Sequence, residues 1–191
     1  MNTYIIGCTH FYHTNIIKYC RSNKFEYSQN GMEKMNALLV KNWNKIVSDK
    51  DTVIHLGDFC FKISITSARD MFNSLNGKKL IVMGNHDGSI SRLYDMGFIS
   101  VLDECVIRYK GKRILCTHRP QDTLRPDIDG VFHAHIHNSS ESDRISAGET
   151  GPIAPFNVNL STEVINYKPV DVSAAFGMLK RQTKGTKFHV T

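Results

Sequence analysis

The sequence lacks any long apolar run, which limits where a chain of 191 residues can reside. The apolar run near the N-terminus stops at Ile5-Ile6, and no later run reaches the ~18 residues that a membrane span requires. We therefore expect neither a signal peptide nor a membrane anchor, and no membrane partner.

Cysteine is scarce and follows no pattern. The five cysteines are Cys8, Cys20, Cys60, Cys105 and Cys116, an odd number with no Cys-x-x-Cys pair. Such a set argues against a disulfide framework and favours a reducing compartment. We expect a cytoplasmic protein.

Internal repeats and long linkers are also absent, and the length suits one domain over residues 1–191. The net charge of +6 is compatible with an anionic substrate or with nucleic acid. The basic tail, residues 180–191, lacks the interleaved aromatic residues of a stacking platform, so a frayed, solvated tail is favoured and nucleic acid is only weakly supported as a partner. No feature indicates the oligomeric state.

The first half of the chain alternates strand and helix signals. Apolar runs predict strands, and apolar residues at helical spacing predict two longer helices and a short one. The predicted strands are Thr3–Ile6, Asp51–Leu56 and Lys79–Met83, and the helices are Gly31–Val47, a segment from Ile65 to about Gly77, and Ser91–Met96.

From Phe98 onward the signals are mostly those of a second sheet. A hairpin is expected around Lys110-Gly111, an aperiodic loop over Ser139–Pro155, and a last helix that begins near Pro169 with Asp171 or Ser173. The strands expected here are Ile99–Leu102, Cys105–Tyr109, Arg113–Cys116, Gly130–His135, Phe156–Leu160 and Val164–Tyr167.

Polar residues that can bind metals follow several of these apolar runs. In Val131–Asn138 three histidines alternate with apolar residues, so on a strand they would face one side. The other stretches are Gly7-Cys8-Thr9-His10, Gly57-Asp58, Gly84-Asn85-His86-Asp87 and Thr117-His118-Arg119-Pro120. Strand ends place such residues on loops that a rigid scaffold holds.

Histidine, aspartate and asparagine are nitrogen and oxygen ligands for Zn, Mn and Fe, and a carboxylate can bridge two ions. Two ions ~3.5–4 Å apart can hold a hydroxide nucleophile and neutralise a phosphate, which is a common solution to phosphoester hydrolysis. The set of residues therefore points to metal-dependent phosphoester chemistry.

The five stretches, in this order, resemble the calcineurin-like metallophosphoesterases, whose pattern is DxH, GD, GNH followed by D or E, a lone His, and GHxH. His10-Phe11-Tyr12-His13 and Asn166-Tyr167-Lys168-Pro169 also resemble the compact, stand-alone members of bacteria and phages. The resemblance implies an α/β fold, the four-layer α/β/β/α sandwich of two mixed sheets flanked by helices.

By this resemblance the chain would hold two divalent metal ions (Mn, Zn or Fe). One would be bound by His10, Asp58 and His137 with Cys8, and the other by Asp58, Asn85, His118 and His135. His86 would lie by the leaving group as the catalytic residue, with Asp87 orienting it. The expected function is hydrolysis of small or nucleotide-like phosphodiesters by a metal-bound hydroxide.

Two positions depart from the family pattern: Cys8 stands where the family has aspartate, and Ala134 where it has glycine. A thiolate ligand would favour Zn or Fe over Mn or Mg. Two alternatives stay open, namely a phosphate- or nucleotide-binding protein with an impaired or one-metal site, and a nuclease.

Other residues near these motifs have less specific interpretations. Arg119 could form a bidentate pair with a phosphate, and His13 could face the phosphate or the surface. His55 is expected in the core, His133 away from the metals or supporting them, and His189 in solvent.

Overall fold

The first of two sheets contains the amino-terminal strands. A computed structural model describes residues 1–139 and 153–185. Its five-stranded sheet has the order β4-β3-β2-β1-β9, in which β9 runs antiparallel to β1 and the other neighbours are parallel. The strands are β1 Thr3–Ile6, β2 Thr52–His55, β3 Lys78–Val82, β4 Val101–Leu102 and β9 Val170–Asp171.

The second sheet has four strands in the order β5-β6-β7-β8. Strands β5 (Cys105–Tyr109) and β6 (Lys112–Cys116) form an antiparallel hairpin, and β7 (Gly130–His133) and β8 (Asn157–Asn159) continue the sheet in parallel. The hairpin turn has positive φ at Lys110 and Gly111, as a tight two-residue turn requires.

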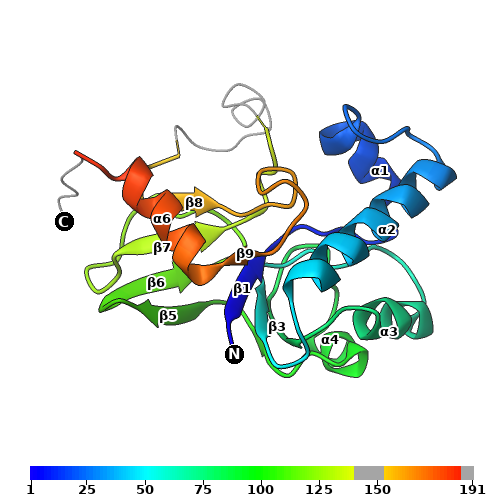
Figure 1. The fold of residues 1–191 in the computed structure, drawn as a ribbon, viewed down its shortest axis with the longest axis horizontal. Coiled ribbons are helices and arrows are strands. Elements are labelled where there is room, and N and C mark those ends of the chain that lie inside the picture. Colours follow the sequence, from blue (N-terminus) through cyan, green and yellow to red (C-terminus); the bar gives the residue numbers. More distant parts are fainter. Residues whose placement is uncertain (140–152, 186–191) are drawn as a thin grey trace.

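Helices flank the two sheets, as Figure 1 shows. Helices α2 (Gln29–Ile46), α3 (Ile65–Asn73) and α4 (Ile90–Met96) flank the five-stranded sheet, and α6 (Val172–Gln182) lies against the four-stranded one. Each begins at a residue whose side-chain oxygen accepts a backbone N–H of the first turn, which stabilises the helix start. These capping residues are Ser28, Ser64, Ser89 and Asp171.

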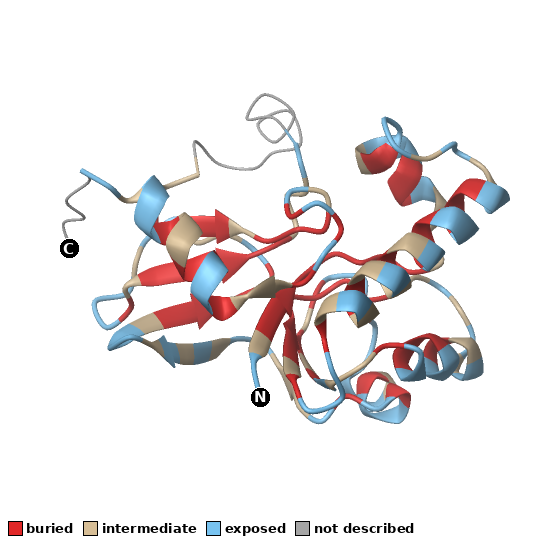
Figure 2. Cartoon of the chain, viewed as in Figure 1, coloured by how far each residue is buried: buried red, intermediate tan, exposed pale blue. Residues whose placement is uncertain are grey.

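Most strand residues are buried, except in β5, whose residues are half-buried or exposed, and the outer faces of the helices are exposed (Figure 2). One buried apolar cluster draws residues from both sheets, including Ile5, Ile81 and Phe132. The predicted fold class is therefore confirmed: two mixed sheets flanked by helices. No helix within the described residues combines the length and apolar character that a bilayer crossing needs.

The sheet prediction for the second half was partly wrong. Strand β4, expected in the second sheet, pairs in parallel with β3 in the first. Residues 164–167, expected as a strand, form turns with positive φ at Asn166 and Tyr167. A short apolar run does not distinguish a strand from a buried turn, which explains the error.

Two further predictions need correction at their ends, and two short helices were missed. Strand β7 stops at His133 instead of His135, and α6 continues through Lys180 and Arg181 of the supposed tail. The short helices α1 (Thr14–Ile16) and η1 (Ile17–Arg21) were not predicted. Residues 140–152 of the predicted loop and 186–191 of the tail, with Lys187 and His189, lie outside the described residues.

Candidate metal centre

Every predicted metal ligand follows the carboxyl end of a strand. Parallel strands end at the same edge of a sheet, and the ends of β1 and β8 also meet, because the Gly7 amide donates to Leu160 O at 3.1 Å. The two sheets therefore present their loops to one place. The residues are Cys8 and His10 after β1, Asp58 after β2, Asn85 after β3, His118 after β6, and His135 and His137 after β7.

Five of these residues have a left-handed backbone conformation. Ten non-glycine residues of the described chain have positive φ, and Cys8, His10, Asp58, His135 and His137 are among them. Such conformations cost about 1–3 kcal/mol each and persist where the surroundings fix them. Cross-strand hydrogen bonds do so here, since the Cys8 amide donates to Gly57 O at 2.9 Å and the His10 amide to Asp58 O at 3.0 Å.

Two glycines make room for the centre. A Cβ at Gly84 would lie 2.2 Å from Asp58 Oδ1, and a Cβ at Gly7 would lie 2.4 Å from the Ala134 Cβ. Ala134 is thus accommodated because residue 7 has no side chain.

Asp58 lies between two groups of ligands. Its Oδ2 is 3.5 Å from His10 Nε2 and 3.4 Å from His118 Nε2, while Oδ1 accepts the His86 backbone N–H at 2.9 Å. Burial by itself would raise the pKa of Asp58, but the two rings and the amide outweigh it and hold the pKa below its usual range. The carboxylate is ionised and can bridge.

On one side of Asp58 lies the Asn85 half, which we define as Asn85, His118 and His135. His118 Nε2 lies 3.1 Å from Asn85 Oδ1 and 3.1 Å from His135 Nδ1. Burial, with the charges of His118 and Arg119, lowers the pKa of His135 to about 3, so its ring is neutral as a ligand must be.

On the other side lies the Cys8 half, which we define as Cys8, His10 and His137. Their potential ligand atoms lie within 4.8 Å of one another, and those of Cys8, Asp58 and His118 form a second such group. The Cys8 Sγ accepts the His135 backbone N–H at 3.2 Å. Burial and the carboxylates of Asp58 and Glu163 raise the pKa of the Cys8 thiol well above its usual value.

The donors fit divalent cations. His118 Nδ1 lies 2.7 Å from Leu56 O and must carry a proton, since a carbonyl only accepts. In the neutral ring Nε2 then carries a lone pair that faces the oxygens of Asn85 and Asp58. Such an arrangement is unfavourable unless a cation or a proton lies between. His10 Nε2 is likewise buried with no hydrogen-bond partner within the described residues.

Two residues that the sequence did not single out belong to the surroundings of the Cys8 half. Glu163 accepts from His137 Nδ1 at 3.1 Å, and its other carboxylate oxygen pairs with the buried Arg21. Glu163 follows β8 as the other ligands follow their strands, so the same rule could have found it. Arg21 lies in a stretch with no distinguishing pattern.

His86 is exposed at the rim, and its ring lies 5.7 Å from that of His10 and 5.4 Å from that of Phe61 between centroids. Asp87 does not orient it. Both Asp87 oxygens accept backbone amides, from Asp58 and Gly84 at 2.8 and 2.7 Å and from Phe59 at 2.8 Å. The buried carboxylate instead fixes the backbone of the loops that carry Asp58 and Asn85.

His13 faces the centre. Its Nδ1 lies 3.2 Å from His10 Nδ1, and its ring stacks on Phe61 at 3.9 Å between centroids. Burial and the neighbouring His86 lower the pKa of His13 to about 4. Arg119 is exposed and lines a cleft of about 400 Å³ together with Asn85, His118 and Gln121.

The remaining described histidines lie in the core. His55 is fully buried and its Nε2 is 3.0 Å from the Thr9 hydroxyl, as expected of a core histidine. His133 is also buried, with Nδ1 2.8 Å from Ala134 O. Because β7 ends there, His133 does not share a strand face with His135 and His137.

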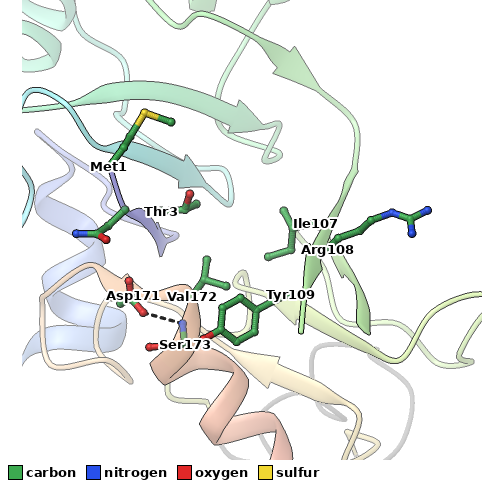
Figure 3. A pocket seen from close by; sticks show the side chains of 9 residues that line it. Met1, Thr3, Ile107, Arg108, Tyr109, Asp171, Val172 and Ser173 are labelled. Atoms are coloured by element: carbon green, nitrogen blue, oxygen red, sulfur yellow. Dashed lines mark hydrogen bonds between the residues drawn. The ribbon is translucent and has the colours of Figure 1, made fainter. Parts of the chain in front are cut away.

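A second cavity, of about 430 Å³, lies at the opposite end of β1 (Figure 3). It is lined by the chain start, by β5 and by the first turn of α6, where Asp171 Oδ1 accepts the Ser173 amide at 2.7 Å. None of the predicted site residues lines it.

Comparisons with known proteins agree with the motif pattern. The family model of the calcineurin-like phosphoesterases matches residues 1–139. The uncharacterized protein MJ1445 of Methanocaldococcus jannaschii is 34% identical over 186 residues, which cover 93% of this chain and 91% of that protein.

Two solved structures are similar to different degrees. The crystal structure of AQ665 from Aquifex aeolicus, a protein of unknown function, matches with a TM-score of 0.69 and 26% identity, covering 93% of this chain and 98% of that one. An archaeal phosphodiesterase matches with a TM-score of 0.40 and 20% identity, covering 73% of this chain and 76% of that one.

Proposed function

The chain belongs to the calcineurin-like phosphoesterase family, and we propose that it is a metal-dependent hydrolase of small phosphodiesters, cyclic or nucleotide-like. The observation that carries the proposal is the meeting of Asp58 and six other predicted ligand residues, from five strand ends of two sheets. Surface histidines would not share one bridging carboxylate.

Two divalent ions would be held, one by the Cys8 half and one by the Asn85 half, with Asp58 between them. When bound, such ions neutralise the phosphate charge and lower the pKa of water, which supplies the nucleophile. The protein's own contribution is to hold histidine nitrogens and one carboxylate in fixed positions.

The rim residues would act on the phosphoester itself. Asn85 and Arg119 can donate hydrogen bonds to phosphate oxygens from the cleft, and His13 lies close enough to the centre to join them. His86 has no side-chain hydrogen bond in the described part of the chain, so its ring is available to donate a proton to the departing oxygen. These are the substrate-binding and catalytic roles that we propose.

The charge of the cleft favours diesters over monoesters. Asp103 and Glu104 line it together with Arg119, and Glu104 is paired with Arg125. A diester carries one negative charge on phosphorus and a monoester up to two, so the acidic residues oppose the monoester more strongly. The exposure of Asn85 and His86 also suits a substrate with two ester groups.

Hydrolysis of bis(4-nitrophenyl) phosphate by protein stripped with a chelator tests the proposal. We expect no activity without metal and recovery with Mn, Zn or Fe, and a slower reaction with 4-nitrophenyl phosphate. Absence of turnover with every divalent ion would contradict the enzyme assignment, and cleavage of single-stranded DNA would extend it to a nuclease.

A second candidate, a phosphate-binding protein without turnover, is favoured by the raised pKa of Cys8. The thiol must lose its proton to bind a metal, and the burial that raises its pKa opposes this loss and weakens metal binding in the Cys8 half. Tight binding of inorganic phosphate by metal-loaded protein that hydrolyses no ester would support this candidate.

A further inference from the structure

A fully buried arginine lies behind the Cys8 half. The Arg21 side chain has no solvent exposure, and it donates to Cys8 O at 2.6 Å and to Thr9 O at 3.0 Å. Its Nε pairs with Glu163 Oε1. A buried guanidinium is strongly unfavourable unless it is paired and hydrogen-bonded, and these three contacts satisfy it.

The pair continues toward the centre through Glu163. Its other oxygen, Oε2, lies 3.1 Å from His137 Nδ1. Since an ionised carboxylate only accepts hydrogen bonds, Nδ1 must carry a proton, which leaves Nε2 as the nitrogen that can bind a metal once its own proton is displaced. The His137 ring stacks on that of His10 at 5.1 Å between centroids, which places it within the Cys8 half.

We infer that Glu163, itself held by Arg21, is a positioning residue that fixes the tautomer and direction of His137 as a ligand of the Cys8 half. The inference rests on the proposed function. A carboxylate behind a metal-binding histidine makes the ring a stronger ligand than a carbonyl does. His118, in the Asn85 half, has only the Leu56 carbonyl.

The position of this carboxylate matters because Cys8 replaces the family's aspartate. The Cys8 half has no carboxylate of its own, and Asp58 lies between the two halves. Glu163 supplies a negative charge behind His137, at the nitrogen that does not face the centre. Arg21 balances that charge and at the same time fixes the backbone of Cys8 and Thr9. One buried ion pair thus orients two of the three ligands.

The test compares metal binding by Glu163→Gln, Glu163→Asp and the parent. Glutamine can still accept a hydrogen bond from His137 but carries no charge. Aspartate keeps the negative charge that pairs with Arg21, but its side chain is one methylene shorter, so the carboxylate lies further from His137. The matched control is Glu33→Gln, the same change on the exposed face of α2. Zn and Mn affinities are measured by equilibrium dialysis, and folding by thermal unfolding of the metal-free proteins.

We expect both Glu163 variants to bind one of the two ions roughly 10–100-fold more weakly, the other ion unchanged, and the control to match the parent. Glu163→Asp keeps the test valid if Glu163→Gln fails to fold. If both variants bound both ions as tightly as the parent, the inference would be overturned. The same would follow if the affinities for both ions fell equally and the thermal stability fell with them. Neither result would contradict the proposed function. A parent that binds no ion would overturn the proposed function, and the inference with it.

Discussion

The Asn85 half and the Cys8 half of the candidate centre arise from the same rule, polar residues after strand ends, but their surroundings differ. The Asn85 half has no carboxylate of its own, and His118 is oriented by the carbonyl of Leu56. Asn85 itself is exposed and opens onto the cleft with Arg119. Exchange of metal and substrate should be easiest on this side.

The Cys8 half is buried and surrounded by charge. Cys8 and His10 are almost without solvent exposure, and the Arg21–Glu163 pair lies directly behind them. Burial opposes protonation of His137, yet hydrogen bonds with Cys20 and Glu163 raise its pKa to about 9. In the metal-free protein a proton therefore occupies the ring that a metal would use.

Because their surroundings differ, the two halves should prefer different metal ions and should be affected by different substitutions. Neutral oxygen and nitrogen ligands suit Mn, whereas a thiolate with two imidazoles suits Zn or Fe. Asp58 lies between the two halves and is close to a histidine of each. Substitutions can therefore remove the centre as a whole, one half of it, or only its chemistry.

The largest effect is expected for Asp58→Ala, because this substitution removes the carboxylate that lies between the two halves. Both ions should be lost, and hydrolysis of the aryl diester should fall by more than ~100-fold. That is the upper end of the loss expected when a residue that only hydrogen-bonds to a metal ligand is removed. Metal analysis with the diester assay measures this, and Asp95→Ala, an exposed aspartate of α4, is the control. Retention of both ions would show that Asp58 does not bridge.

His86→Ala should leave metal binding in both halves unchanged and should lower only the rate of hydrolysis. We expect turnover to fall ~10²–10⁴-fold, because the departing oxygen loses its proton donor, with both ions retained. A diester with a more acidic leaving group should lose less. An intact rate, or the loss of an ion, would disprove the proposed role.

Substitution of Cys8 should affect one half. Cys8→Ser should weaken the ion of the Cys8 half by ~10-fold or more and spare the other, and Cys8→Asp should shift its preference from Zn toward Mn. Bound metal should protect the thiol of the parent from alkylation, with Cys105→Ser as the control for other thiols. If no substitution alters metal content or rate, Cys8 is not a ligand and His10, Asp58 and His137 hold the ion alone.

The smallest effect concerns the pH dependence of the metal-free protein. Burial raises the pKa of Glu163, but Arg21 and His137 outweigh it and lower the value to about 2. Glu163 thus adds stability above its ordinary value of 4.5 that is lost as the pH falls toward 2. His137 adds stability below 6.5 that is lost as the pH rises through about 9.

Urea unfolding across this pH range measures the effect. The difference in free energy of unfolding between the parent and Glu163→Gln should be largest at pH 5 to 6 and should shrink toward pH 2. A difference that does not change with pH would show that Glu163 does not titrate as the structure indicates.

The sequence predicted the ends of β1, β2 and β3 well because the signal is local. An apolar run followed by glycine and a polar ligand marks the point where a buried strand reaches the loop, and this located Asp58 and Asn85 directly. The pattern of motifs also led to the family and to the fold. It could not show that Asp87 binds backbone amides, since that depends on how two loops approach each other.

The residues and turns that were not predicted also depend on tertiary contacts. Arg21 and Glu163 are 142 positions apart, and a buried ion pair leaves no periodic signal in either segment. The turn at Asn166-Tyr167 was mistaken for a strand because positive φ at a tyrosine is imposed by tertiary contacts. The histidines of Val131–Asn138 alternate in sequence, but the chain leaves the strand at His133.

Anomalous diffraction from crystals grown with Zn and Mn, collected on either side of each absorption edge, tests the central claim most directly. We predict two peaks separated by Asp58, with the Zn signal among Cys8, His10 and His137 and the Mn signal among Asn85, His118 and His135. A single peak, no peak, or the same ion in both halves irrespective of supply would contradict the account of two halves with different chemistry.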